Sequence, residues 1–174
     1  MSLSSCNKEE SNKEESLGLE VFLHTKTDVY NISKDTRPIL GGKDSDDAIA
    51  GAVYWEPGYT KALYLSVKNS DSVETTCVVA LEATDIVANF NEVLTYYTFF
   101  NTTNPVDLSE ANKSNRVEKG TNIVTERITL APDAEYFFVV VIRMNGDASW
   151  EYTDGSIVFY LNVITDSFAG DVNQ

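Results

Sequence analysis

Few residues of this chain have the types and spacing that a catalytic centre needs. The sequence has one histidine, His24, whereas a hydrolytic zinc site needs two or three imidazoles or an H-E-x-x-H helix. A serine hydrolase triad would have to use His24, and no Gly-x-Ser-x-Gly elbow occurs. Paired carboxylates could serve a glycosidase, but chance pairs are certain among 27 acidic residues. We therefore predict that the protein is not an enzyme and that His24 is an ordinary surface residue.

One loop has the chemistry of a calcium site. Asp44, Asp46 and Asp47 follow Gly41-Gly42 and gather the hard oxygen ligands that Ca²⁺ prefers. The glutamate that closes an EF-hand loop is missing from the expected place, so the alternative is a solvated acidic loop. Calcium bound by these three aspartates is the one cofactor that we keep as a candidate.

Aromatic residues are the strongest binding signal. They gather at expected turns and strand ends, where rings can stack on sugars or anchor a protein partner. The alternative is that they fill the open ends of the fold. The candidate contact residues are Trp55, Tyr59, Trp150 and Tyr152, each near a carboxylate in the segments Trp55-Glu56-Pro57-Gly58-Tyr59 and Trp150-Glu151-Tyr152.

The first sixteen residues are typical of a lipoprotein tether. Leu3-Ser4-Ser5-Cys6 resembles the end of a lipoprotein signal, in which Cys6 takes the lipid. A pentapeptide, Asn-Lys-Glu-Glu-Ser, then occurs twice without an apolar residue, which predicts a solvated linker. The alternative interpretation is that Met1-Ser2-Leu3 is a cloning remnant and that Leu3 matches the motif by chance. We expect an extracellular protein tethered to the bacterial surface, with the membrane reached only through the lipid.

Composition indicates one acidic globular domain over residues 17–174. The chain has 174 residues, 43% of them hydrophobic, and a net charge of −14, of which residues 1–16 contribute −2. Such a surface repels phosphate backbones and anionic headgroups, which excludes nucleic acid and direct membrane adsorption. Of the two cysteines, Cys77 lies in an apolar run and is predicted to be a small buried hydrophobe.

The apolar pattern predicts strands almost throughout. Alternating or continuous apolar runs are separated by clusters of Gly, Pro, Asn, Asp and Ser, and no segment sustains a 3.6-residue period. We predict an antiparallel β-sandwich, jelly-roll or immunoglobulin-like, of about eight strands. A short helix is possible only in 107–119, and 25–48 is expected to be a loop excursion. The expected strands are 18–24, 49–55, 60–68, 75–83, 87–100, 122–130, 135–143 and 156–164. Eight residues are expected in the core between the sheets: Leu65, Val67, Val79, Leu81, Val139, Val141, Phe159 and Leu161.

Two segments carry a family resemblance. Trp55 to Asn69 followed by Val79-Ala80-Leu81, and Leu130-Ala131-Pro132 followed by the strands up to Val163, resemble the TasA/camelysin-like family of Gram-positive exported matrix proteins. The match covers about a third of the chain, and it departs from the family at Asp71, near a usual Gly, and at Trp150, in place of an Asn. The resemblance implies a jelly-roll protein of the extracellular matrix or cell surface. The resemblance to the camelysin type also implies a metallopeptidase, but no residue pattern here supports that activity.

Two function classes follow from these observations. The first is a non-enzymatic β-sandwich of the cell surface or biofilm matrix that acts through protein–protein contacts or self-association. The alternative is a carbohydrate-binding surface lipoprotein module. An exposed coplanar row of aromatic rings would favour sugar binding, and a long unpaired edge strand would favour strand addition.

Overall fold

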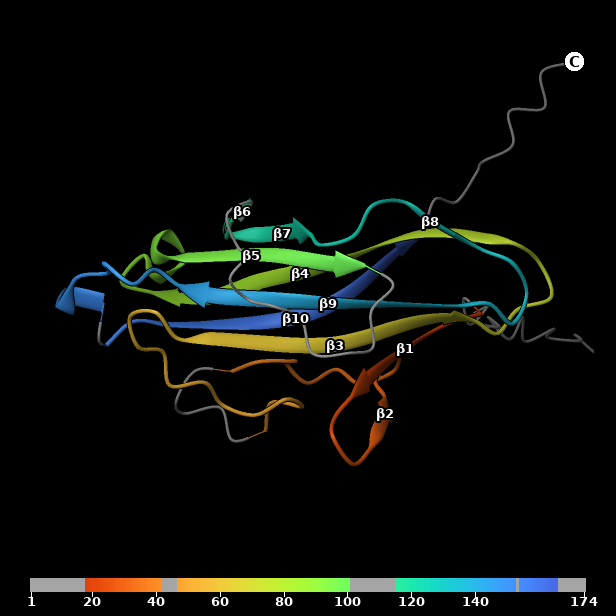
Figure 1. Cartoon of the computed structure of the whole chain (residues 1–174), viewed down its shortest axis with the longest axis horizontal. Helices are drawn as coiled ribbons and strands as arrows, with labels where there is room; N and C mark the ends of the chain where they lie inside the picture. Colours follow the sequence, from red (N-terminus) through yellow and green to blue (C-terminus); the bar gives the residue numbers. More distant parts are fainter. Residues whose placement is uncertain (1–17, 42–46, 101–114, 153, 166–174) are drawn as a thin grey trace, which may run out of the picture.

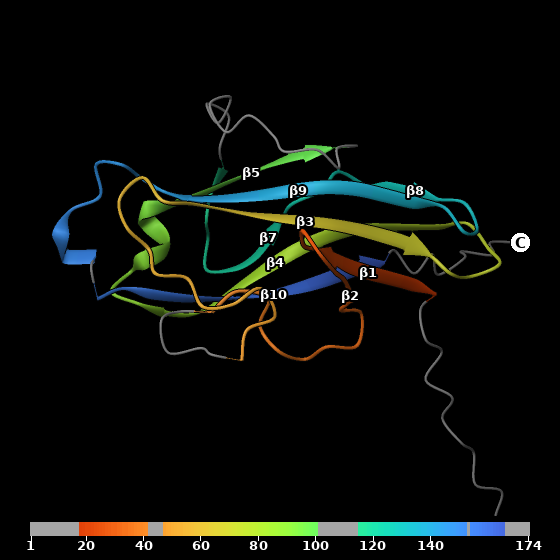
Figure 2. The same ribbon diagram turned by 60° about the horizontal axis from the view of Figure 1, so that its bottom comes forward.

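Two antiparallel sheets pack face to face in the computed structural model, which describes residues 18–41, 47–100, 115–152 and 154–165. Figure 1 shows the long strands running along the length of the molecule, and Figure 2 shows the two layers one above the other. The larger sheet has the order β2 (Val29–Asn31), β1 (Leu19–His24), β3 (Thr60–Asn69), β9 (Glu135–Met144), β5 (Leu94–Phe100) and β6 (Asn115–Arg116). The smaller sheet has the order β10 (Ser156–Thr165), β4 (Thr75–Val87) and β7 (Gly120–Ile123), and β8 (Ile128–Leu130) also pairs with β4.

The predicted all-β antiparallel sandwich is confirmed. The described part of the chain has ten strands instead of about eight. Two very short edge strands form in segments that were expected to be something else, one expected strand is divided in two, and one expected strand does not form. The strand β2 lies in the expected loop excursion, and β6 lies at the end of the segment that was expected to hold a helix. Residues 107–114 of that segment lie outside the described residues, and 117–119 are neither helix nor strand.

The inner core follows from simple alternation. In β3, Leu63, Leu65 and Val67 are buried and contribute to one large hydrophobic cluster between the sheets. Phe159 of β10 is buried in the same cluster, and the half-buried Leu161 packs against it. Val79 and Leu81 of β4 also lie there, so five of the eight expected core residues are fully buried between the sheets and a sixth lies at their edge.

The expectation for Val139 and Val141 is wrong in its choice of face. Both side chains are fully buried, but they pack with Tyr97 on the outer face of the six-stranded sheet. The cause is pairing: Phe138 and Val140 of β9 lie opposite Leu65 and Leu63 of β3, and directly paired residues share a face. Because β9 is apolar on both faces, its sequence could not reveal which set points inward.

The expected strand 49–55 is also wrong. This segment makes irregular backbone hydrogen bonds with the preceding loop, from Ile49 N to Pro38 O (2.9 Å) and from Ala50 N to Ile39 O (2.9 Å). Gly51 has a φ of +87°, which breaks an extended strand. Val53 is still buried in the inner core. The apolar pattern of this segment therefore indicated burial correctly, although the segment does not pair as a strand.

Two other long strands are broken in the structure. The expected strand 87–100 begins with a short 3-10 helix, η1 (Phe90–Val93), preceded by Ala88 and Asn89 with positive φ, and only β5 is extended. The expected strand 122–130 is divided into β7 and β8 by a bend at which the Thr125 hydroxyl accepts a hydrogen bond from Val79 N (2.9 Å).

Among the described residues, no helix has the length and apolar character to cross a membrane.

Candidate functional site

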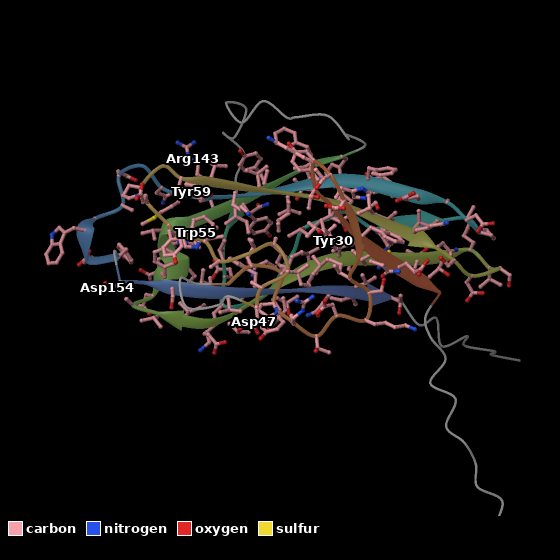
Figure 3. The ribbon with its side chains drawn as sticks, turned by 90° about the horizontal axis from the view of Figure 1, so that it is seen from below. Tyr30, Asp47, Trp55, Tyr59, Arg143 and Asp154 are labelled. Carbon is pink, nitrogen blue, oxygen red and sulfur yellow. The ribbon has the colours of Figure 1, made fainter. Side chains whose placement is uncertain are left out.

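Three segments that are far apart in sequence meet at one end of the sandwich. We call this the aromatic end: residues 54–59, the η1 segment 89–93, and the described residues of 143–155, which are the last two residues of β9 and the loop after it. Gly58 N donates to Met144 O (3.1 Å), Met144 N donates to Tyr59 O (2.9 Å), and Asn145 N donates to Val93 O (2.8 Å). Gly58 has a φ of +83°, so the Pro-Gly turn has the conformation that a glycine accommodates at little cost. Figures 2 and 3 show these segments together at one extremity of the molecule.

Trp55 is the packed centre of this end. Its ring lies edge-to-face on Tyr59, with centroids 5.9 Å apart and an interplanar angle of 89°, and 6.4 Å from the ring of Phe90. The side chain is half-buried against the inner core, and its Nε1 is buried without a hydrogen-bond partner among the described residues. Trp55 therefore serves mainly to close the end of the sandwich, while Tyr59, 42% exposed, presents its ring to solvent.

Trp150 is the opposite case. It lies in a second short 3-10 helix, η3 (Trp150–Tyr152), and is 87% exposed, whereas Tyr152 packs against the inner core. Tyr152 O accepts a hydrogen bond from Gly155 N (2.9 Å), and a Cβ on Gly155 would come within 2.2 Å of the Phe90 ring. Because Phe90 also contacts Trp55, the segments that carry the four predicted contact residues meet around Phe90 at the same end of the sandwich.

The surroundings of these rings are acidic. The three segments carry five exposed carboxylates and one base, Arg143. Figure 3 shows Arg143 near Tyr59, and Asp154 at the same extremity, with Tyr30 further along the molecule. The aromatic end is thus a small apolar surface with a predominantly negative rim: Glu56, Glu92, Asp147, Glu151 and Asp154.

Sequence reasoning missed a polar chain on the outer face of the six-stranded sheet. Ser66, which is completely buried, donates to Glu135 Oε1 (2.6 Å), and its hydroxyl oxygen lies 2.7 Å from His24 Nε2. The His24 ring also packs on Phe137, with centroids 5.4 Å apart. His24 is therefore not an ordinary surface residue. Only the polar residues at outward positions of β1, β3 and β9 could have signalled this chain, and the strand pairing that joins them is not visible in the sequence.

The hydrogen-bonded set of His24, Ser66 and Glu135 has the residue types of a hydrolase triad, but in a different order. The hydroxyl lies between the carboxylate and the imidazole, whereas in a triad the imidazole lies between the other two groups. Ser66 has one proton and donates it to Glu135, so it accepts from His24. The geometry therefore orients an imidazole and does not activate a serine nucleophile.

The remaining predicted residues have the following positions. Asp47 is exposed, Asp44 and Asp46 lie outside the described residues, and within the described ranges no three His, Cys, Asp or Glu side chains are grouped as metal ligands. Calcium stays a prediction. Cys77 is 2% exposed, as expected, and burial raises the pKa of its thiol to about 11. Cys6 and residues 1–16 lie outside the described part.

One strand edge is open where the sheets meet at the side of the sandwich. Phe159 directs its backbone N–H and C=O away from β4 and pairs with Leu40 there. Because these directions alternate along a strand, Leu161, Val163 and Thr165 point the same way, and no described strand pairs with them. A groove of about 970 Å³ runs beside them, bordered also by Leu19 and Ile32.

Comparisons with known proteins find no similarity. No protein-family model matches the chain. No curated protein and no solved structure matches it significantly.

Proposed function

We propose that this protein is a non-enzymatic surface module that acts by binding another protein, with the aromatic end as its contact surface. The observation that carries the proposal is Trp150, which is 87% exposed at the same end of the sandwich as the Trp55–Tyr59 pair. Burying a large exposed ring against a partner contributes favourably to the free energy of binding. Tryptophan is among the residues that most often dominate the binding energy at interfaces. The negative rim fits a partner whose apolar pocket is bordered by Lys and Arg.

Two features favour a protein partner over a sugar, one at this end and one further along β10. A sugar platform needs rings that lie in one plane, and the rings of Trp55 and Tyr59 are perpendicular. The open edge of β10 offers backbone groups that an extended protein segment could pair with, and a sugar could not use them in that way. Carbohydrate binding at the aromatic end is therefore the weaker hypothesis.

The place of action belongs to the same proposal. We infer from Leu3-Ser4-Ser5-Cys6 and the polar repeat behind it that a lipid on Cys6 holds the domain outside the bacterial membrane. The substitution Cys6→Ser should move the protein from the membrane fraction to the medium. A Cys6→Ser protein that stays with the membrane would contradict the tether without affecting the contact surface.

The contact surface is tested by cross-linking from its most exposed ring. A photoreactive benzoyl-phenylalanine is placed at position 150 in the intact protein at the cell envelope, and at Tyr30 as a control. Tyr30 is a 48% exposed aromatic of β2, distant from the aromatic end in Figure 3. We expect a discrete adduct from position 150 that a protease degrades and a glycosidase does not, and none from position 30. In purified form, Trp150→Ala should weaken binding of the captured partner by about 2 kcal/mol or more.

Three results would overturn the proposal. They are equal adducts from both positions, no adduct from position 150, and an adduct that only a glycosidase removes. The last would instead support the carbohydrate-binding alternative.

A further inference from the structure

A concave site lies at the edge of the six-stranded sheet, where β1 ends and no described strand continues beside the first residues of β3. Its lining comes from both faces: Lys61, Leu63 and Leu65 point to the inner face, and Tyr64 and Phe137 to the outer one. The groove has a volume of about 690 Å³, and it is formed by the end of β1, the turn after it, Ala50, the first half of β3 and Phe137 of β9. That volume falls within the range of small-ligand sites, about 300–1,000 Å³. Its lining is mostly apolar, with the rings of Tyr64 and Phe137, and a few polar groups from His24, Thr25, Lys26 and Lys61.

The charge of this groove is opposite to that of the molecule. Its described lining residues include two lysines and no carboxylate, in a chain with 27 acids and 13 bases. Lys61 Nζ donates to Ala50 O (3.1 Å), which fixes one ammonium at the groove and leaves two of its N–H groups for a ligand. Glu135 is linked to His24 through Ser66 and lies near one side of the groove, but it does not line it. Repulsion of an anion by carboxylates further away is screened beyond about 8 Å at physiological salt.

The imidazole in this groove is held in one orientation. Because Ser66 donates its only proton to Glu135, the atom of His24 that faces Ser66, Nε2, must carry a hydrogen. In the neutral ring, Nδ1 is then an acceptor, and no described residue bonds to it. Contact with Phe137, at an interplanar angle of 50°, restrains the ring further. The site therefore offers one oriented acceptor beside two cationic donors.

We propose that this groove binds an acidic sugar, such as a uronic acid residue of a polysaccharide. The ligand lies across the edge of β3. Its carboxylate lies between Lys26 and Lys61, the C–H face of its ring lies on the outer-face rings of Phe137 and Tyr64, and a hydroxyl donates to His24 Nδ1. A simple inorganic anion would leave the aromatic walls unused, and a purely apolar ligand would leave the lysines unused. A sugar acid uses both, and its hydroxyls match the remaining polar groups.

The test is calorimetric titration of the full chain with three probes. These are a glucuronic acid oligosaccharide, a neutral glucose oligosaccharide of the same length, and benzoate, which carries the carboxylate and a flat ring without hydroxyls. We expect the uronate to bind and its dissociation constant to rise with salt, with the neutral sugar and benzoate each weaker by at least about tenfold.

Variants locate the site. The double substitution Lys26→Gln and Lys61→Gln keeps hydrogen-bond donors but removes both charges, and it should weaken uronate binding by about a hundredfold. His24→Asn should weaken it by about tenfold and should reduce discrimination among uronates with different hydroxyl positions. Lys119→Gln is the matched control, because this exposed lysine lies between β6 and β7 and outside the groove. Thermal unfolding shows that each variant is folded.

Four outcomes would overturn the inference. They are no uronate binding by the folded wild-type chain, equal binding of the neutral sugar, equal binding of benzoate, and an equal loss in Lys119→Gln and the double variant. Trp150→Ala should leave uronate binding unchanged, so failure at this groove and failure at the aromatic end are distinguishable.

Discussion

The six-stranded sheet buries side chains on both of its faces, but by different means. Its inner face is covered by the second sheet, and Leu65 and Val140 lie there in a continuous core. On its outer face, Val139 and Val141 are as completely buried, but they pack under rings of neighbouring strands, among them Tyr97. One face is thus closed by a whole layer of structure and the other by individual side chains. We therefore expect more of the stability to come from the inner face, and the proposed ligand groove lies at the edge between the two faces.

The largest expected effect is on the inner face. Leu65→Ala removes a fully buried side chain from between the two sheets, where neither sheet can collapse easily into the cavity. We expect a loss of about 2–5 kcal/mol in the free energy of unfolding, measured by denaturant titration. A loss below about 1 kcal/mol would mean that the two sheets collapse into the cavity easily, which contradicts the expected difference between the faces.

Two buried polar residues of β3 extend the comparison. Asn69 Nδ2 donates to Val73 O (2.7 Å) and to the buried Leu130 O (3.0 Å), so Asn69→Ala leaves acceptors unsatisfied and should cost about 2–4 kcal/mol. Ser66→Ala removes a hydroxyl that is as completely buried, but its partners are the half-buried His24 and the exposed Glu135, which water can reach. We expect a cost of about 1 kcal/mol in the same measurement. Equal costs would show that both faces are equally closed to water.

Adjacent valines of β9 give the best matched pair. Val140 and Val141 have the same side chain and the same complete burial on opposite faces. Val140→Ala should cost about 2–3 kcal/mol and Val141→Ala about 1–2 kcal/mol, because side chains on the outer face can shift into the space more easily than a packed sheet. The reverse order would break the comparison.

The smallest expected effect is at the aromatic end. Trp150→Ala should change the free energy of unfolding by no more than about 0.5 kcal/mol, since the side chain is 87% exposed. Trp55 also lies at the aromatic end, but its ring packs on Tyr59 and Phe90. Trp55→Ala should lower the free energy of unfolding by about 3 kcal/mol and provides the matched control. A large loss from Trp150→Ala would assign that ring to stability instead of contact.

The candidate site was predictable only in its residue types. Tryptophans beside turns indicated surface contact, and the structure brings their segments to one end, but it divides their roles: Trp55 closes the sandwich and Trp150 projects from it. The position of an aromatic residue beside a turn does not reveal how deeply its side chain is buried. The basic groove was not predicted, because Lys26, Lys61 and Phe137 are far apart in the chain and meet only through the pairing of β1, β3 and β9.

By itself, the sequence determined what has a local physical cause. Alternation with period two predicted β3 and β10, and with them the inward positions of Leu65 and Phe159, because successive side chains of a strand point to opposite faces. Tertiary structure alone decided which face of the uniformly apolar β9 turned inward, that 49–55 would be an irregular segment, and that His24, Ser66 and Glu135 would join. These outcomes depend on strand register, and register is set by contacts between residues that are distant in the chain.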